Sequence, residues 1–460
     1  MELRPEFVEH LHRIMPRDAQ ALAQALTATE PAVSVRLNPF KGAELEPGLE
    51  PVPWCRYGAY LEHRPPFTFD PDWHAGRYYV QDAASMFLHH VLQCQVQEPV
   101  RYLDLCAAPG GKATCACGAL PAGSLLVANE VVPARARVLA HNMARWGQAA
   151  TVVTCDTPER VGHTLPAFFD VIAADVPCSG EGMMRKDDEA VEQWSPQLVR
   201  QCAERQRDIL AQVWPALKPG GLLIYSTCTF NREENELMAD YIARHLGAEA
   251  IEVPVLPAWR VAPGIDTIHR CYRFMPHRTR GEGLFVCAMR KDAAPAAAQK
   301  SQKPRRAATP PVPATVKGWL QGDYAWQLGG DTVTAVPAAH HGAVAAVQQA
   351  LHVMAAGVEV AHVKGKNLVP THALAMSTAL RGDAFPAVEV DYATAVAFLR
   401  GESIQVTAPR GHTLVTHQGA VLGWVNNLGA RANNLYPKPL RILSSHAPAT
   451  PPVVVIPRER

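Results

Sequence analysis

The chain has 460 residues, 48% of them apolar, and its 44 Lys and Arg nearly balance its 43 Asp and Glu. This length predicts roughly two to four domains, and this composition excludes a disordered chain, a collagen and a coiled coil. No apolar run is long enough to span a membrane, and the first residues, Met1–Glu6, lack the charged and then apolar layout of a signal peptide. The 11 cysteines are scattered along the chain. We therefore expect reduced thiols and a cytoplasmic protein.

The first 75 residues are predicted to form a small N-terminal α/β region. A helical period runs from Glu6 to Leu26. The apolar segment Val33–Asn38 follows it and predicts a strand.

Residues 76–291 are predicted to form a core domain. From about Pro99 to Arg290 the chain alternates short apolar runs with amphipathic stretches, which predicts a parallel sheet covered by helices on both faces. Helical periods cover Ala134–Trp146 and Gln197–Leu217, and Gly283–Met289 is predicted to add an edge strand. The predicted buried strands are Arg101–Leu105, Ser124–Asn129, Thr151–Thr154, Asp170–Ala174 and Leu222–Ser226. Sheets of this kind bind ligands at the carboxyl ends of their strands.

The composition changes at residues 292–314, where Ala, Pro, Lys and Arg predict a semi-stiff linker. Residues 315–460 then predict a small, mostly β domain, with strands at Ser403–Thr407, His412–Thr416 and Ala420–Val425. Residues 300–460 carry 15 Lys and Arg against 8 Asp and Glu, whereas residues 1–299 carry 29 against 35. A basic C-terminal part suits binding to a polyanion, although a solvated basic face has the same composition.

A glycine turn follows the first predicted strand of the core. It consists of Cys106, Ala107, Ala108, Pro109, Gly110, Gly111 and Lys112. Glycines let the backbone approach a ligand closely, and the helix that follows offers free N–H groups. The segment matches neither the dinucleotide motif nor a P-loop, which needs an earlier Gly and a Ser or Thr after the Lys. Alone, the turn indicates either a ligand site or a tight strand–helix connection.

Three acidic residues end the next three predicted strands. They are Glu130, Asp156 and Asp175. An acid at the second strand can accept both hydroxyls of a ribose, and one at the third can accept from an adenine amino group. Three carboxylates would repel a pyrophosphate but suit a neutral or cationic adenosine ligand such as S-adenosylmethionine. A single acid at such a position is more often a helix cap.

Two cysteines also follow predicted strands of the core. Cys178 lies after the fourth strand and Cys228 after the fifth, so both thiols are expected over the same crevice. Most free cysteines are inert small hydrophobes, which is the interpretation for Cys55, Cys94, Cys202, Cys271 and Cys287. Cys115 and Cys117 stand close enough in sequence to suggest a metal site. No second Cys or His pair lies at ligand spacing, so we expect no metal and expect both thiols to be packed.

These motifs together resemble those of the bacterial RNA cytosine-C5 methyltransferases of the Sun/Fmu family. The resemblance covers about residues 30–290 and is carried by Val35–Asn38, Tyr79–Met86, Ala107–Lys112, Asp175–Gly180, Arg205, Gln206, Leu210 and Thr227–Thr229. It implies a Rossmann-like core that uses S-adenosylmethionine, preceded by an RNA-binding region at residues 1–75.

The C-terminal part resembles a narrower group, the members that act on 16S ribosomal RNA and end in a PUA-like RNA-binding domain. The matching segments are Lys364–Lys366 with Pro370, Leu422–Trp424 and Asn433–Lys438. This resemblance implies a PUA-like domain at residues 315–460 and the RNA of the small ribosomal subunit as partner. A monomer is the simplest expectation.

The resemblance also assigns roles to residues. Cys228 would attack cytosine C6, Cys178 would assist product release, and Asp175 would lie beside cytosine N3. The turn Cys106–Lys112 with Glu130, Asp156 and Asp175 would bind the methyl donor. A helix predicted to open at Asn231–Glu236 would favour a thiolate at Cys228, and the cations Arg185 and Lys186 would suit RNA phosphates.

Three other functions remain open from the sequence. A DNA cytosine-C5 methyltransferase would use the Pro-Cys thiol as nucleophile and need no second thiol, which Cys228 argues against. A transfer RNA methyltransferase would share the whole core and differ in its C-terminal part. A catalytically silent RNA-binding assembly factor would need neither thiol, yet both are present.

Overall fold

The computed structural model describes residues 2–293 and 312–458. Most of the predicted linker 292–314, with its basic residues Lys300–Arg306, lies outside the described residues. Within the described ranges, no helix combines the length and the apolar character that a membrane crossing requires.

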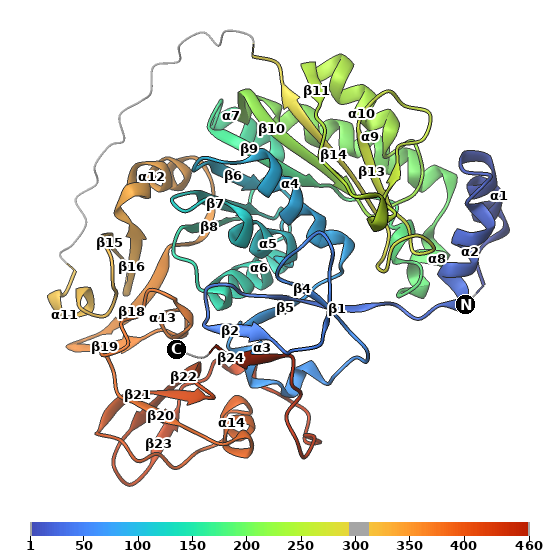
Figure 1. Ribbon diagram of the computed structural model, residues 1–460. Coiled ribbons are helices and arrows are strands. Elements are labelled where there is room, and N and C mark those ends of the chain that lie inside the picture. Colours follow the sequence, from blue (N-terminus) through green and yellow to red (C-terminus); the bar gives the residue numbers. More distant parts are fainter. Residues whose placement is uncertain (1, 294–311, 459–460) are drawn as a thin grey trace.

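A mixed sheet of ten strands forms the centre of the molecule, and its middle is parallel as predicted (Figure 1). The parallel strands are β6 (Arg101–Asp104), β7 (Leu125–Asn129), β8 (Thr151–Thr154), β9 (Phe169–Asp175) and β10 (Leu217–Thr227). Their order in the sheet is β10-β9-β6-β7-β8. The chain order reverses between β6 and β9, and ligands of such sheets bind at that switch point.

Antiparallel strands flank this parallel centre. They are β11 (Ala248–Ala250), β12 (Ala262–Pro263), β13 (Cys271–Phe274) and β14 (Leu284–Lys291) on one side, and β17 (Val353–Ala356) on the other. The predicted strand Gly283–Met289 is β14, but its predicted place at the edge is wrong, because β14 lies between β10 and β13.

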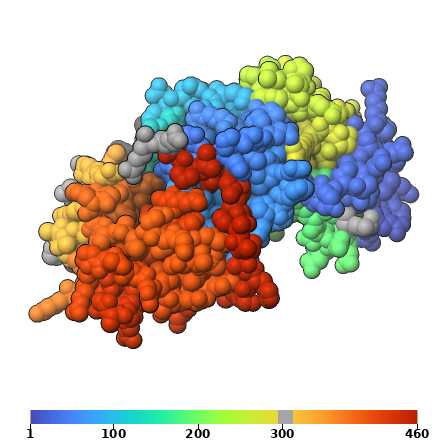
Figure 2. Space-filling view, turned by 60° about the horizontal axis from the view of Figure 1, so that its bottom comes forward, coloured from blue at the N-terminus to red at the C-terminus, as the bar shows by residue number. Residues whose placement is uncertain are grey.

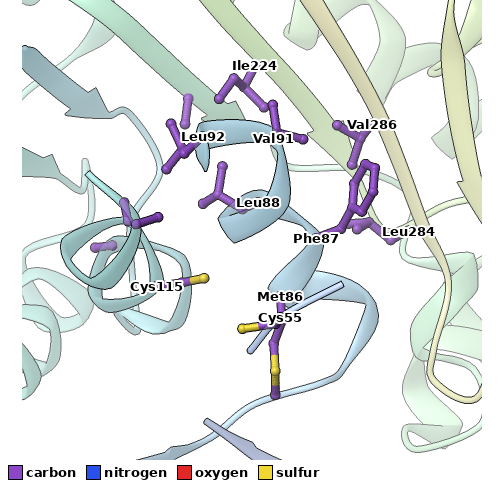
Figure 3. Packing of buried hydrophobic residues seen from close by; sticks show 14 of the residues in the cluster. Cys55, Met86, Phe87, Leu88, Val91, Leu92, Cys115, Ile224, Leu284 and Val286 are labelled. Atoms are coloured by element: carbon purple, nitrogen blue, oxygen red, sulfur yellow. The ribbon is translucent and has the colours of Figure 1, made fainter. Parts of the chain in front are cut away.

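Helices cover both faces of the sheet because successive strand residues point to opposite sides. On one face lie α4 (Phe87–Gln95), α5 (Gly111–Ala119) and α6 (Pro133–Trp146). Figure 3 shows Val91 of α4 close to Ile224 of β10, and Phe87 close to Leu284 and Val286 of β14. On the other face lie α7 (Pro158–Thr164), α9 (Pro196–Val213), α10 (Glu236–Tyr241) and α12 (His341–Ala350).

The N-terminal residues form two helices and a small antiparallel sheet. The predicted helix Glu6–Leu26 is wrong as one element, because α1 (Pro5–Ile14) ends before Met15 and α2 begins at Ala19 (Ala19–Ala28). Pro16 disfavours helical geometry at the residue before it, and Met15 is indeed non-helical. The sheet order is β3 (Glu50–Pro51), β4 (Gly58–Leu61), β1 (Val33–Leu37), β5 (Tyr78–Val80), with α3 (Pro71–His74) beside it.

The C-terminal residues form two further four-stranded sheets. One contains β15 (Tyr324–Gly329), β16 (Thr332–Pro337), β18 (Val358–Lys364) and β19 (Asn367–Pro370), and the other β20 (Ala387–Glu389), β21 (Gly411–His417), β22 (Ala420–Asn427) and β23 (Ala432–Asn434). The helices α11 (Ala314–Lys317), α13 (His372–Met376) and α14 (Tyr392–Leu399) pack with them. The predicted strand Ser403–Thr407 is wrong, because these residues have no regular secondary structure and no ladder partner among the described residues.

Two C-terminal strands return to the earlier parts of the chain. The strand β17 pairs antiparallel with β8 and so extends the central sheet. The strand β24 (Val455–Pro457) pairs with β2 (Ala43–Leu45) of the N-terminal region, as Figure 1 shows. In Figure 2 the red C-terminal residues lie against the blue N-terminal residues. The C-terminal part is therefore joined to the rest by strand pairing as well as by the linker.

Candidate active site

The glycine turn connects β6 to α5, as predicted. Gly110 adopts left-handed geometry with φ of 113°, which favours glycine at the position that caps α5. Arg36 of β1 lies beneath the turn, 1% exposed, and donates hydrogen bonds to Thr114 Oγ1 at 2.6 Å and Gly111 O at 3.2 Å. A strand of the N-terminal region therefore supports the turn.

Asp175 ends β9 beside this turn. Its Oδ2 accepts a hydrogen bond from Lys112 Nζ at 2.9 Å, and its Oδ1 accepts one from Ser226 Oγ at 2.7 Å. Burial disfavours the charged form of Lys112, but the acidic groups around it, Asp175 first, outweigh burial and raise the Lys112 pKa. A cation and a carboxylate thus stand together at the switch point.

Glu130 and Asp156 follow β7 and β8 at the same edge of the sheet. The Glu130 carboxylate accepts a hydrogen bond from Val132 N at 3.0 Å and lies 3.4 Å from Arg135 Nη1. Asp156 Oδ2 lies 3.6 Å from Arg160 Nε. A cavity of about 350 Å³ opens next to Asp156.

Asp104, at the end of β6, was not predicted as a site residue. It is 1% exposed, and neither of its carboxylate oxygens has a hydrogen-bond partner among the described residues. Burial, and then the negative charge of Asp175, raise its pKa to about 7. A buried acid without a partner is costly, so this position suits a ligand that brings a cation.

We expect Asp104→Asn to stabilise the protein, and more at pH 8 than at pH 5. The folded-state pKa of about 7 lies above the unfolded value of 3.8, so the stability contributed by the protonated carboxyl falls as the pH rises from about 4 to 7. Between pH 5 and pH 8 this amounts to about 2.5 kcal/mol, which the neutral Asn does not lose. Thermal unfolding at both pH values, with the exposed Asp208→Asn as control, measures the difference. Equal gains at both pH values would contradict the raised pKa.

The two predicted thiols meet over the crevice. Cys178 Sγ lies 3.2 Å from Cys228 Sγ, and Cys228 N lies 3.4 Å from Cys178 Sγ. The neighbouring strands β9 and β10, parallel in register, bring the two residues together. The hydrogen bond with Cys228, followed by burial, raises the pKa of Cys178 well above its usual value. The raised pKa favours the neutral thiol at Cys178, and either sulfur of the pair can be the hydrogen-bond donor.

A buried polar network fixes the loops that carry the thiols. Glu181 accepts hydrogen bonds from the backbone N–H groups of Phe230 at 2.7 Å and Asn231 at 2.9 Å. Glu234 accepts from Ser179 N at 3.0 Å and from Asn231 Nδ2 at 2.8 Å. Burial raises the pKa of Glu234 to about 7. Asn231 also donates to Glu181 at 3.0 Å, so it links the two carboxylates and through them the two loops.

The helix predicted to open at Asn231–Glu236 begins at the end of that range, at Glu236, because Asn231 and Glu234 use their side chains in the buried network. The thiol therefore lies in a loop, several residues before any helix terminus. Arg185 does not face solvent as a phosphate ligand, since it is buried and pairs with Glu282 at 2.8 Å.

The other thiols of the glycine-turn helix are packed as expected. Burial raises the pKa of Cys115, and it raises that of Cys117 to about 12. Across residues 2–293 and 312–458, no cluster of three or more His, Cys, Asp or Glu side chains has the arrangement of a metal site.

The arrangement fits S-adenosylmethionine. The partnerless carboxyl of Asp104 offers a place for a cationic group, Glu130 offers oxygens to the ribose hydroxyls, and the cavity beside Asp156 offers space for the base. The thiol pair lies on the other side of the glycine turn, after β9 and β10 and beside Asp175. A donor and a second substrate can therefore meet across the switch point.

The residues that were missed share a recognisable signal. Asp104, Glu181 and Glu234 are acids in segments that the structure buries. Asp104 stands in a buried stretch of its strand, between Leu103 and Leu105, where an acid is unusual enough to indicate a functional role. The pairing of Glu181 with Asn231 crosses 50 residues of sequence and has no local signal.

Comparison with known families gives three matches along the chain. The model described as 16S rRNA methyltransferase RsmB/F matches residues 90–290. The N-terminal domain of 16S rRNA methyltransferase RsmF matches residues 3–83, and the methyltransferase RsmF PUA domain matches residues 385–442.

Whole-chain relatives and solved structures agree with these matches. Ribosomal RNA small subunit methyltransferase F of Salmonella typhi is 32% identical over 416 residues, 85% of each chain. The protein of the same name from Klebsiella pneumoniae (strain 342) is 32% identical over 412 residues, 85% of this chain and 84% of that one. NSun6 from Pyrococcus horikoshii with SFG has a similar fold, with TM-score 0.53, 18% identity, and coverage of 63% of this chain and 98% of that one. A methyltransferase homolog protein from the same organism gives TM-score 0.51, 24% identity, and 62% and 94% coverage.

Proposed function

This chain belongs to the RsmB/F family of 16S rRNA methyltransferases, and from that membership we propose that it methylates C5 of a cytosine in 16S ribosomal RNA through a covalent cysteine adduct. The chain is an RNA methyltransferase that uses S-adenosylmethionine. We propose three further points: that the modified atom is C5 of cytosine, that the substrate is 16S RNA, and that the reaction passes through a cysteine adduct.

The observation that carries the proposal is the thiol pair. Cys178 and Cys228 lie with their sulfurs 3.2 Å apart at the ends of adjacent parallel strands, next to the Lys112–Asp175 ion pair. One thiol suffices to form a cysteine adduct, so the second thiol needs another role. Because it contacts the first, it can assist the step in which the adduct is released.

In this mechanism Cys228 is the nucleophile. Its sulfur bonds to C6 of the cytosine, and the electron pair of the C5–C6 double bond makes C5 nucleophilic. S-adenosylmethionine supplies the methyl group, as a sulfonium, to C5. S-adenosylhomocysteine is left behind, a solvent water accepts the C5 proton, the pair of the C5–H bond re-forms the double bond, and the C6–S bond breaks with its electron pair returning to Cys228. The protonated thiol of Cys178 donates a hydrogen bond to that departing sulfur.

Asp175 and Lys112 act on the other side of the base. Asp175 hydrogen-bonds the ring at N3 and so stabilises the adduct, a general-acid role. Lys112, 2.9 Å from Asp175 Oδ2, supplies a proton donor at that position. The turn Cys106–Lys112, with Glu130, Asp156 and Asp175, binds the donor. Asp104 adds a buried carboxyl beside the same turn.

The substrate and partner proposals rest on the flanking parts of the chain. We assign RNA binding to residues 1–75 and to the PUA-like part at residues 315–460, on either side of the core 76–291 and the linker 292–314. The excess of Lys and Arg in residues 300–460 supports contact with RNA phosphates. We propose that the enzyme acts as a cytoplasmic monomer on the RNA of the small ribosomal subunit.

Transfer of labelled methyl groups tests the proposal. Purified 30S subunits, protein-free 16S RNA, total transfer RNA and duplex DNA are each incubated with the enzyme and S-adenosylmethionine, and the labelled nucleoside is identified after digestion. We expect label in 16S RNA as 5-methylcytosine, with little in transfer RNA or DNA. Label confined to transfer RNA would overturn the substrate, and label at another atom would overturn the mechanism. Tight RNA binding with no label anywhere would favour the silent assembly factor.

A further inference from the structure

We propose that His352 and Met354, which come from the C-terminal part of the chain, form one wall of the pocket for the adenine base of the methyl donor. The inference rests on the donor site described above and extends it to residues outside the methyltransferase core. It predicts that the core without its C-terminal partner strand binds the donor poorly, independently of RNA.

The pocket is the cavity of about 350 Å³ next to Asp156. Its volume lies within the range of about 300–1,000 Å³ that is usual for small-ligand sites. The core supplies Val131, Pro133 and Arg137 from the region after β7, and Cys155, Asp156 and Thr157 from the region after β8. His352 and Met354 supply the remaining wall.

The position of the cavity identifies which end of the donor it receives. The glycine turn follows β6, Glu130 follows β7 and Asp156 follows β8, and these strands are neighbours in that order. A ligand whose ribose hydroxyls bind Glu130 extends from the turn along this edge, so its base reaches the end of β8. The residues of the core that line the cavity follow β7 and β8, and they include Asp156 but not Glu130.

Backbone contacts fix His352 and Met354 at this place. In the ladder between β17 and β8, Val353 pairs with Thr154 and Ala355 with Val153. His352 N donates a hydrogen bond to Asp156 Oδ2 at 2.8 Å, and Cys155 N donates one to His352 O at 2.9 Å. The C-terminal strand thus orients the acid that we assign to the adenine amino group.

The side chains have the chemistry that a purine requires. The Met354 thioether is flexible and polarizable, and such groups pack well against an aromatic ring. The exposed imidazole of His352 can stack on the base at the mouth of the cavity or hydrogen-bond its edge. Asp156 Oδ1 accepts a hydrogen bond from Thr157 N at 3.2 Å and retains a second lone pair that can accept from the amino group.

Calorimetric titration of the full chain with S-adenosylhomocysteine, without RNA, tests the proposal. We expect Met354→Ala to weaken binding on the order of five- to tenfold, which corresponds to about 1 kcal/mol of lost packing. Met354→Leu keeps the volume and is expected to bind within about twofold of the parent. Val353→Ala is the matched control, since Val353 is the neighbouring residue of β17 but packs into the cluster on the opposite face of the sheet.

The outcomes separate this inference from the proposed function. Asp156→Asn removes a core ligand and is expected to weaken binding whatever β17 contributes. If Asp156→Asn weakens binding but Met354→Ala binds like the parent, the adenine wall is wrong and the donor site stands. If Met354→Ala and Val353→Ala weaken binding equally, the loss comes from general disturbance of β17. The proposal that Met354 contacts the adenine base is then overturned. If the parent chain does not bind S-adenosylhomocysteine, the donor site fails as well.

Discussion

Cys228→Ala is expected to reduce methyl transfer on the order of 10⁴-fold or more while leaving donor binding unchanged. Cytosine C5 becomes nucleophilic only when a thiolate adds to C6, and Cys228 is the thiol that we assign to this addition. Loss of a covalent nucleophile removes most of the rate enhancement of an enzyme that depends on it. Single-turnover transfer to 16S RNA measures the rate, and calorimetric titration with S-adenosylhomocysteine measures donor binding.

Cys202→Ala is the matched control for this experiment. Cys202 lies on α9, half-buried, and burial raises the pKa of its thiol to about 11. It is not bonded to the thiol pair, so its loss should leave transfer within about twofold of the parent. A Cys228→Ala enzyme that retains more than a tenth of the parent rate would exclude Cys228 as the nucleophile.

Cys178→Ala is expected to trap the enzyme on its RNA. With Cys228 intact, addition to C6 and methylation at C5 still proceed, but no thiol stands 3.2 Å from the departing sulfur to stabilise it. The adduct should therefore accumulate as a covalent protein–RNA species that migrates slowly on a denaturing gel. We expect a large fraction of the enzyme in this species, against a trace for the parent.

The double variant Cys178→Ala/Cys228→Ala shows whether that species is the proposed one. It should give no covalent product, because the sulfur that forms the bond is missing. The covalent species should also depend on the donor if methylation precedes the blocked step. A Cys178→Ala enzyme that turns over normally without a trapped species would show that release does not need the second thiol.

The core of this fold could be predicted from sequence because its signals are local. The segment Thr151–Thr154 is a strand with the predicted bounds, and Cys178 and Cys228 follow strands as expected. Apolar runs of strand length followed by glycine or acidic residues carry both the topology and the edge at which ligands bind. Two thiols after adjacent strands of a parallel sheet then have to be neighbours.

The features that sequence did not reveal are those that depend on distant partners. The pairing of β17 with β8 and of β24 with β2 joins segments far apart in the chain. No turn or sequence motif in β17 or β24 indicates which strand each of them pairs with. The change of composition at the linker suggested a separable C-terminal part, but hydrogen bonds of the backbone cross that boundary. For the same reason, deleting residues 300–460 would remove a strand of the central sheet along with the RNA-binding surface.

The pairing of β17 with β8 also sets an order of events during synthesis. Thr154 leaves the ribosome about 200 residues before its partner Val353, which at roughly 5–20 residues per second is about 10–40 s. Over that interval the edge of β8 has no partner and is open to pairing with other chains, a recognised route to aggregation. A nascent chain that stalls before residue 353 would already carry both thiols, but it would have an unprotected sheet edge and an incomplete site for the methyl donor. Slow translation through residues 155–352 should therefore lower the yield of active enzyme more than slow translation elsewhere.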